Sequence, residues 1–250
     1  MNSRQEQIID IVNKNGSTTV KDLKDLFGDV SKMTLRRDLE FLDKENKIIR
    51  VHGGAKSLNA IVNNDLLYPK RATDNVESKK LIAQKALKFI SPNCTIYLDS
   101  GSTISEFTKI LPDIPMFIFT GNLVAALDLT RCVNAQVSMF GGRVNTQSYC
   151  VSGYNAPNYL RDVYFSYAFF GTTGYSDECG FTCGHESEYN LKKMMIEKSD
   201  KNIVLMDSSK VGKNSTFRFA SLEDIDIVIS DGKLPKKTIE QFEKNGITVL

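Results

Sequence analysis

Two adjacent arginines stand inside the stretch SKMTLRRDLEFL, residues 31–42. In a helix, with about 100° between successive residues, Leu35 and Leu39 share the apolar face, and Arg36 and Arg37 point away from it. A guanidinium is planar and can donate paired hydrogen bonds to a base edge or to a phosphate. Charged residues on a helix surface usually serve only solubility. The elements around the two arginines must therefore decide between a solvated face and a nucleic-acid contact.

A second set of polar residues follows the apolar runs of the later chain. Glycines, hydroxyls, two carboxylates and two cations recur in loops at predicted strand ends, where open α/β sheets bind their ligands. One loop, with Asp99 before a helix start, offers backbone N–H groups to an anion. Loops contain such residues for ordinary reasons as well, but five loops on one predicted edge favour a small phosphorylated polyol as ligand. The candidates are Asp99, Ser100, Gly101, Ser102, Thr103, Thr120, Gly121, Asn122, Gly141, Gly142, Arg143, Gly171, Thr172, Asp207 and Lys210.

Glu188 and Lys192 complete the set of candidate effector-binding residues. They also have a plainer explanation, because a Glu and a Lys four residues apart on a helix form a favourable pair without any ligand.

The sequence offers little to catalysis or to metals. Five cysteines without a framework of close pairs fit reduced thiols. Cys179, Cys183 and His185 have the spacing C-x3-C-x-H, which supplies only three ligands and lacks a second ligand pair. We therefore expect no metal site, no cofactor and no catalytic residue.

Three short helices are predicted at the start of the chain. Apolar residues recur at helical spacing from Gln5 to Lys14, while Thr19 and Ser31 are each placed to cap a following helix. The second and third helices, joined by a tight turn containing Gly28, form a helix-turn-helix.

A strand is predicted from Ile48 to His52 and meets Gly53 and Gly54, whose conformational freedom suits a hairpin. This hairpin completes a winged helix-turn-helix, in which the second helix of the motif enters a major groove. Asp38 falls beside the apolar face, so we expect it to pair with a nearby donor and orient the helix, since a carboxylate would repel DNA. The residues expected to contact DNA are Ser31, Lys32, Met33, Thr34, Arg36, Arg37, Arg50, His52, Gly53 and Gly54.

Residues 57–76 show neither helical nor strand periodicity and are predicted to be a linker. From residue 77 onward, strands alternate with helices, which is typical of an α/β domain with a mostly parallel, buried sheet. Strands are expected at 95–98, 116–119, 136–140, 203–206, 225–229 and 247–250, with an apolar stretch at 163–170, and helices at 77–90, 103–111, after 122, 187–198 and 235–244.

The bulk composition is that of an ordinary globular protein, with 41% hydrophobic residues, 25% charged residues and a formal net charge of +2. The net charge by itself does not indicate nucleic acid. No apolar run is long enough for a membrane span, and the first residues lack the layout of a signal peptide. We therefore expect a cytoplasmic protein without a membrane partner.

Several motifs resemble those of one family. Arg4, Ile8 and Val12, followed by SKMTLRRDL, resemble the signature of the DeoR family of bacterial transcription regulators, and RVHGGA at 50–55 is similar to that family's wing. K-x2-IA from Lys79, with DSGST, TGN, GGR, E-x3-K and DSSKVG, resembles the family's C-terminal sensor domain. Two stretches depart from the family pattern: FGDVS carries an extra residue, and TGN replaces the more usual Thr-Asn-Asn.

The resemblance implies sequence-specific DNA binding through the recognition helix, typically by a repressor. It also implies a sensor domain that is related in fold to sugar-phosphate isomerases and takes a phosphorylated sugar as effector. Because helix-turn-helix proteins commonly bind paired half-sites as symmetric dimers, we expect a homo-oligomer, at least a dimer.

The sequence as a whole predicts a small winged helix-turn-helix head at residues 1–56, a linker at 57–76, and a larger Rossmann-like, sugar-phosphate-isomerase-like α/β domain that senses an effector at 77–250. The expected function is regulation of a sugar-metabolism operon, as a repressor, through duplex operator DNA. Two alternatives remain open. The chain could be a sugar-phosphate isomerase-like enzyme with an accessory DNA-binding head, using Asp99, Asp207, Glu188 or Lys210 as acid and base. The head could instead mediate protein contacts.

Overall fold

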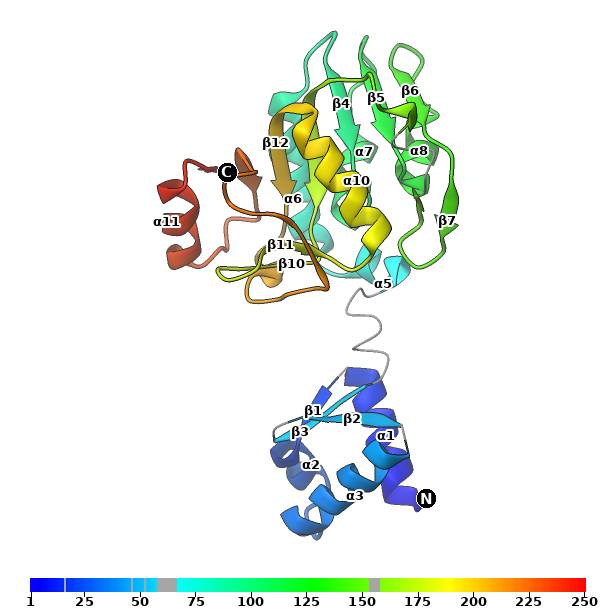
Figure 1. Cartoon of the computed structure of the whole chain (residues 1–250), viewed down its shortest axis with the longest axis vertical. Helices are drawn as coiled ribbons and strands as arrows, with labels where there is room; N and C mark the ends of the chain where they lie inside the picture. The colour runs from blue at the N-terminus through cyan, green and yellow to red at the C-terminus, as the bar shows by residue number, and fades with distance from the viewer. Residues whose placement is uncertain (16, 46, 52, 58–66, 153–157) are drawn as a thin grey trace. The chain divides into compact units, whose positions relative to one another are not determined.

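The chain forms two compact units, Met1–Asn64 and Asp65–Leu250. They are seen in a computed structural model that describes residues 1–15, 17–45, 47–51, 53–57, 67–152 and 158–250 (Figure 1). Each unit has its own hydrophobic core, so each is described by itself.

The first unit contains the three predicted helices, and their caps are those that the residue types favour. The Thr19 hydroxyl accepts a hydrogen bond from the Asp22 N–H, and the Asp22 carboxylate accepts one from the Thr19 N–H, so the two residues form a capping box. The Ser31 hydroxyl accepts a hydrogen bond from the Thr34 N–H at 3.1 Å. Its elements are α1 (Ser3–Asn15), β1 (Ser17–Thr19), α2 (Val20–Leu26), α3 (Lys32–Lys44), β2 (Ile48–Val51) and β3 (Gly54–Ser57).

The core of the first unit lies between the helices and a small antiparallel sheet of order β1-β3-β2. Leu35, Leu39 and Leu42 of α3 are all buried in it, as the helical spacing predicted. Gly54 is required where β3 pairs with β1, because a Cβ there would collide with the carbonyl oxygen of Thr18. The strand β1 was not predicted, since three residues are too short to show an alternating pattern.

The range predicted to be a linker contains a helix. Residues 68–73 form α5 (Tyr68–Thr73), and residue 57 belongs to β3, while residues 58–66 lie outside the described residues. Pro69 stands in the first turn of α5, where its missing N–H costs nothing. The ring of Tyr68 stacks on Tyr149 at 5.0 Å between centroids. Six residues held by such tertiary contacts leave no helical period in the sequence, so periodicity could not reveal α5.

The second unit is built on a seven-stranded sheet of order β15-β14-β12-β9-β4-β5-β6, in which every pair of neighbours is parallel. The predicted parallel α/β domain is therefore confirmed. The strands are β4 (Thr95–Leu98), β5 (Phe117–Thr120), β6 (Gln136–Met139), β9 (Phe165–Gly171), β12 (Ser199–Leu205), β14 (Ile227–Ile229) and β15 (Thr248–Val249). The helices are α6 (Val76–Ala86), η1 (Leu87–Phe89), α7 (Ser102–Ile110), α8 (Leu123–Leu129), α10 (Glu186–Glu197), η2 (Ser208–Lys210) and α11 (Lys236–Lys244).

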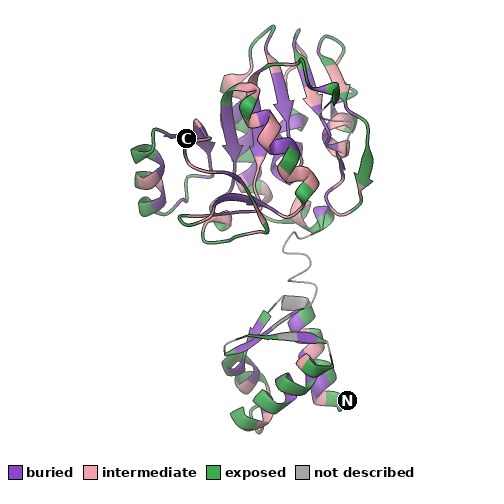
Figure 2. Cartoon of the chain, viewed as in Figure 1, coloured by how far each residue is buried: buried purple, intermediate pink, exposed green. Residues whose placement is uncertain are grey.

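Both faces are covered at the centre of the sheet, which explains why β4, β9 and β14 are mostly apolar. Ile96 and Leu98 of β4 belong to the core under α6 and α7, whereas Tyr97 belongs to the opposite core, under α10. The two groups of helices lie on opposite sides of the sheet (Figure 1), and the central strands between them are mostly buried (Figure 2).

Two smaller antiparallel sheets were not predicted. One has the order β10-β11-β13 and packs Tyr175 and Phe181 against Phe242 of α11. The other is the hairpin of β7 and β8. Their strands are β7 (Arg143–Asn145), β8 (Cys150–Ser152), β10 (Gly174–Ser176), β11 (Gly180–Cys183) and β13 (Phe217–Ala220). No helix of the described part of the chain is long and apolar enough to cross a membrane.

Replacement of Leu39 by alanine should selectively destabilise the first unit. Leu39 is 1% exposed, and removing a buried leucine side chain costs about 2–5 kcal/mol. We expect the opening free energy of the α3 amides, measured by hydrogen exchange in the full chain, to fall by that amount. Phe41→Ala on the same helix is the control, because Phe41 is 40% exposed and its loss should cost less than about 1 kcal/mol. Equal losses in the two variants would contradict the described core.

Candidate effector pocket and nucleic-acid interface

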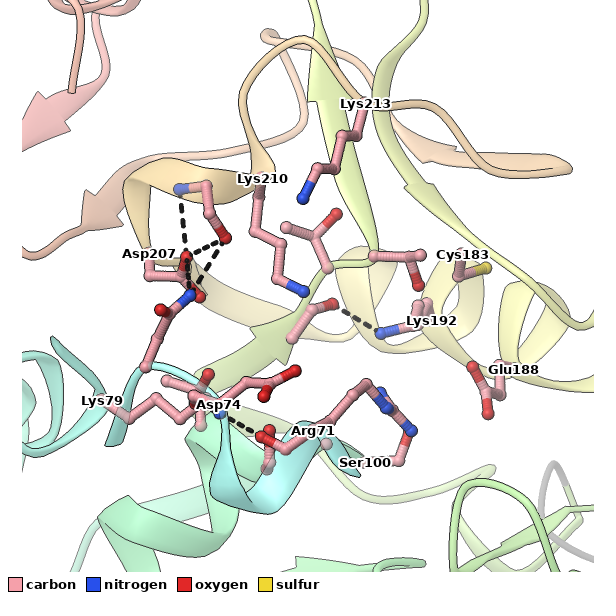
Figure 3. Close-up of a pocket in the computed structure, with 18 residues that line it drawn as sticks. Arg71, Asp74, Lys79, Ser100, Cys183, Glu188, Lys192, Asp207, Lys210 and Lys213 are labelled. Atoms are coloured by element: carbon pink, nitrogen blue, oxygen red, sulfur yellow. Dashed lines mark hydrogen bonds between the residues drawn. The ribbon is translucent and has the colours of Figure 1, made fainter. Parts of the chain in front are cut away.

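A pocket of about 310 Å³ lies at the carboxyl ends of the central strands. In the sheet, β4 neighbours β9; β5 and β6 continue to one side, and β12, β14 and β15 to the other. The chain therefore reverses its direction of travel across the sheet between β4 and β9, and a crevice opens at such a switch point. The pocket is lined by Arg71, Asp74, Asn75, Lys79, Ser100, Gly101, Ser102, Thr103, Gly171, Thr172, Thr173, Cys183, Glu188, Lys192, Asp207, Ser209, Lys210 and Lys213 (Figure 3).

A buried ion pair includes one residue of the pocket lining, Lys192. The Lys192 ammonium on α10 contacts the Asp99 carboxylate that follows β4, and it donates a hydrogen bond to the Gly171 carbonyl at 2.8 Å. The Gly171 N–H in turn donates to the Asp99 carboxylate at 2.9 Å. Burial opposes the charge on Lys192, but the carboxylate beside it favours that charge, and the net effect raises the pKa of Lys192. These contacts join three elements at the switch point.

The first turn of α7 forms one wall. Gly101 is the N-cap residue of α7 with φ of +124°, a conformation that favours glycine. Because glycine has no side chain, α7 lacks a side-chain cap, and the N–H groups of its first turn can serve a bound anion. Ser102 and Thr103 also line the pocket at this wall.

A second wall comes from α5 and the start of α6. The sequence predicted a linker over α5 and up to residue 76, whereas Lys79 falls in the helix predicted at 77–90. Lys79 is buried and donates hydrogen bonds to the carbonyls of Arg71 and Asp74, so it holds the end of α5. Burial lowers the pKa of Lys79. Asn75 donates to Asp207 and to Ser209, at 3.2 Å each, and thereby ties the same segment to the loop after β12.

Three cationic side chains extend into the pocket. In Figure 3, Lys210 and Lys213 extend into the pocket from the segment after β12, and Arg71 comes from α5. The Arg71 Nε is buried and has no hydrogen-bond partner among the described residues. A cluster of cations around a cavity with hydroxyls and helix N–H groups favours an anionic, hydroxylated ligand.

The structure gathers most of the predicted effector-binding residues in this pocket. The lining includes Ser100, Gly101, Ser102, Thr103, Gly171, Thr172, Glu188, Lys192, Asp207 and Lys210, whereas Asp99 does not line the pocket and pairs with Lys192. Sequence reasoning missed Arg71, Asp74, Asn75 and Lys213. Four further lining residues were noted in motifs or loops but not placed in the predicted effector set: Lys79, Thr173, Cys183 and Ser209.

The loops after β5 and β6 are not brought to the pocket, because both strands lie on the far side of β4. Thr120 and Asn122 are buried and have structural partners instead: the Thr120 hydroxyl donates to the Leu98 carbonyl at 2.7 Å, and the Asn122 side chain caps α8. Gly121 packs against Phe140, where a Cβ would not fit. Gly141, Gly142 and Arg143 are exposed, and Arg143 lines a separate hollow beside the β7–β8 hairpin.

In the first unit, the outer face of α3 is polar and exposed. Lys32, Met33, Arg36 and Arg37 are exposed, while Thr34 is half-buried and Ser31 caps the helix. The green outer surface of α3 is visible in Figure 2. This arrangement matches the division of the helix into a core face and an outer face that the sequence predicted.

The hairpin supplies the remaining predicted DNA contacts. Arg50 is exposed, and its N–H donates to the Asp43 carboxylate of α3 at 2.8 Å, which fixes β2 to the end of the helix. Gly53 has φ of +81° at the turn into β3, which begins at Gly54. His52 lies outside the described residues.

Comparison with known proteins identifies the family. A model described as DeoR-like helix-turn-helix domain matches residues 4–60, and a model described as DeoR C terminal sensor domain matches residues 74–232. The chain belongs to the DeoR family of transcriptional regulators. The resemblance inferred from the sequence motifs is thereby confirmed.

Curated relatives of this DeoR-family chain cover almost its whole length. An uncharacterized HTH-type transcriptional regulator from Bacillus subtilis is 35% identical over 98% of this chain and 95% of its own. A putative aga operon transcriptional repressor from Escherichia coli O157:H7 is 30% identical over 99% and 92%. The L-fucose operon activator of Haemophilus influenzae is 32% identical over 100% of both. Among solved structures, ribose 5-phosphate isomerase A from Methanocaldococcus jannaschii has a TM-score of 0.41 and 17% identity over 55% of each chain.

Removal of the buried lysine should destabilise the second unit strongly. Lys192→Met leaves the Asp99 carboxylate buried without its counter-charge, which costs about 3–5 kcal/mol. The control is Lys193→Met, which removes the adjacent, more exposed lysine and its 3.8 Å pair with Asp224, at a cost below about 1 kcal/mol. Urea unfolding of the two variants measures both values, and similar losses would contradict the role of the ion pair.

The same pair predicts a pH dependence. Because the folded-state pKa of Lys192 is raised above its unfolded value of about 10.4, its stabilisation is fully present below that pH and is lost as the pH rises through the folded-state pKa. The difference in unfolding free energy between the wild type and Lys192→Met should thus stay constant from neutral pH to about pH 10 and shrink only above it.

Proposed function

We propose that this DeoR-family protein is a sequence-specific repressor of a sugar-metabolism operon, and that a phosphorylated sugar bound in the second unit controls its affinity for operator DNA. One observation carries the ligand assignment: Arg71, Lys210 and Lys213 line the same cavity as the N-terminus of α7, which has no side-chain cap. A phosphate group matches these donors, and the neighbouring hydroxyls and carboxylates match the hydroxyl groups of a sugar.

The direction of control is part of the proposal. The relatives include a protein named a repressor and one named an activator, so family membership alone fits either direction. Repression agrees with the function typical of the family. By linkage, an effector that weakens operator binding must itself bind more weakly to the operator complex.

We propose regulation and no catalysis for the second unit. Asp99 does not line the pocket, and its carboxylate pairs with Lys192 and accepts a hydrogen bond from the Gly171 N–H. Asp207 accepts hydrogen bonds from Asn75 and from the Ser209 N–H. Turnover of a phosphorylated sugar by the purified protein would overturn this part of the proposal.

We further propose that the predicted contact residues of α3 and the hairpin bind DNA. The protein that binds the operator is at least a dimer. Helix-turn-helix proteins read two half-sites about one helical turn apart, so two copies of this head are needed for one operator. A single bound copy at saturation on the promoter region would argue against the dimer.

Loss of both outer arginines should remove operator recognition. We expect Arg36→Ala combined with Arg37→Ala to lower the affinity for the protein's own promoter region to that for random duplex, a fall of at least about 1,000-fold at 0.15 M salt. The control is Lys236→Ala combined with Lys237→Ala, which removes an adjacent pair of cations from α11. Electrophoretic mobility shifts measure the affinities. Retained promoter preference in the arginine variant would refute the assignment of α3.

Ligand binding should depend on the cations of the pocket. We expect one or more phosphorylated sugars to raise the melting temperature while the unphosphorylated sugars do not, and Arg71→Gln to weaken that binding by about tenfold or more, since a charge-assisted hydrogen bond contributes about 1.5–3 kcal/mol. Lys70→Gln is the control, because Lys70 is the exposed neighbour on α5 and does not line the pocket. Stabilisation by the unphosphorylated sugars alone would refute the ligand class.

A further inference from the structure

A buried carboxylate lies on the helix that carries the outward arginines. Asp38 of α3 is 5% exposed, although its neighbours Arg36 and Arg37 are exposed. Its two oxygens have separate partners, and both partners come from the first turns of α1. The Arg4 Nε donates to Asp38 Oδ2 at 2.7 Å, and the Gln5 Nε2 donates to Asp38 Oδ1 at 3.0 Å.

The partners of Asp38 are themselves held in place by the start of α1. The Asn2 side chain accepts a hydrogen bond from the Gln5 N–H at 2.9 Å, and the Gln5 side-chain oxygen accepts one from the Asn2 N–H at 3.0 Å. This reciprocal pair caps α1 in the manner of a capping box. Gln5 thereby uses its oxygen for its own helix and its nitrogen for α3, so the first turn of α1 and the recognition helix are joined directly.

Arg4 keeps donors available for a further partner. Its side chain is 29% exposed, and within the described part of the chain its side-chain hydrogen bond is made through Nε alone. The two terminal nitrogens of the guanidinium lie beyond that bond and can donate to an acceptor on the outside.

The position of Asp38 on α3 places Arg4 beside the predicted DNA-contact surface. With about 100° per residue, Thr34 lies one turn before Asp38 and about 40° closer to the outer face, and Arg37 lies about 60° further in the same direction. Arg4 therefore extends the basic surface of Arg37 across the flank of α3 onto α1. The first helix of such a head crosses the DNA backbone while the recognition helix occupies the groove.

We propose that Arg4 binds a backbone phosphate of the operator, and that Asp38 is a positioning residue that orients Arg4 and sets the angle of the recognition helix against α1. The proposal rests on the proposed DNA-binding function. It assigns Arg4 to the contacts that supply affinity and register on the duplex, since phosphate contacts carry no base information directly.

The experiment measures affinity of the full-length chain for its own promoter region and for random duplex across a series of salt concentrations. Removing one phosphate contact reduces the slope of log K against log salt by about one, whichever duplex is used. We expect Arg4→Gln to show this smaller slope and a roughly tenfold loss of affinity at low salt for both duplexes. Lys236→Gln, which removes one positive charge from α11, should retain the wild-type slope.

The sign of the change in operator affinity distinguishes a positioning role of Asp38 from a purely electrostatic one. Asp38→Asn removes a negative charge from the DNA-facing helix, so charge alone predicts tighter binding. Positioning predicts weaker operator binding despite the added positive charge, because Arg4 loses its anchor. Asp10→Asn, the same charge change at an exposed site on α1, should not weaken the complex.

A double variant keeps the test independent of folding. Arg4→Gln with Asp38→Asn preserves the net charge and allows an uncharged hydrogen bond between the two side chains. If Arg4 contacts a phosphate, the double variant keeps the reduced slope; recovery of both the slope and the affinity would show a structural pair only and overturn the proposal. A wild-type slope in Arg4→Gln would also overturn it. Absence of promoter preference in the wild type would instead refute the proposed function, together with this inference.

Discussion

The ion pair between Asp99 and Lys192 is the interaction on which the second unit depends. It joins the end of β4, the end of β9 and α10 at the switch point, where successive strands begin to be added on the other side of β4. Both charges are buried, so neither is tolerable without the other. Within the pair, Asp99 neutralises the charge of Lys192. The other cations of the lining therefore determine which ligands the pocket attracts.

The two units use charge in opposite ways. In the first unit, the cations lie on a convex helix surface in high-dielectric solvent, where each contributes little until a polyanion with many phosphates is bound. In the second unit, the cations surround a cavity, where a single phosphate meets several donors at once. The net charge of the chain, +2, reveals neither group of cations, because acidic residues elsewhere in the sequence balance their positive charges.

Local patterns predicted the elements well and the site only partly. The α3 helix follows from periodicity, since it buries a regular apolar face, and β4 follows from a short apolar run, since both of its faces are buried. The order of strands is not a local property, and for that reason Thr120 and Arg143 looked equivalent to Ser100 although β5 and β6 lie beyond β4. Arg71 could not be predicted for another reason. It comes from α5, a helix that depends on contacts of Tyr68 and Lys79, and the charged, proline-containing sequence of α5 resembles that of a connecting segment.

The shortness of α5 has a consequence for control. A helix of six residues cannot persist on its own in water, because nucleation costs more than so few hydrogen bonds return. It is kept folded by contacts at the edge of the pocket, and in the described part of the chain it is the first element after β3. The part of the second unit nearest in sequence to the first therefore needs little free energy to change its conformation. A modest difference in ligand affinity between two arrangements of α5 is enough to change their populations.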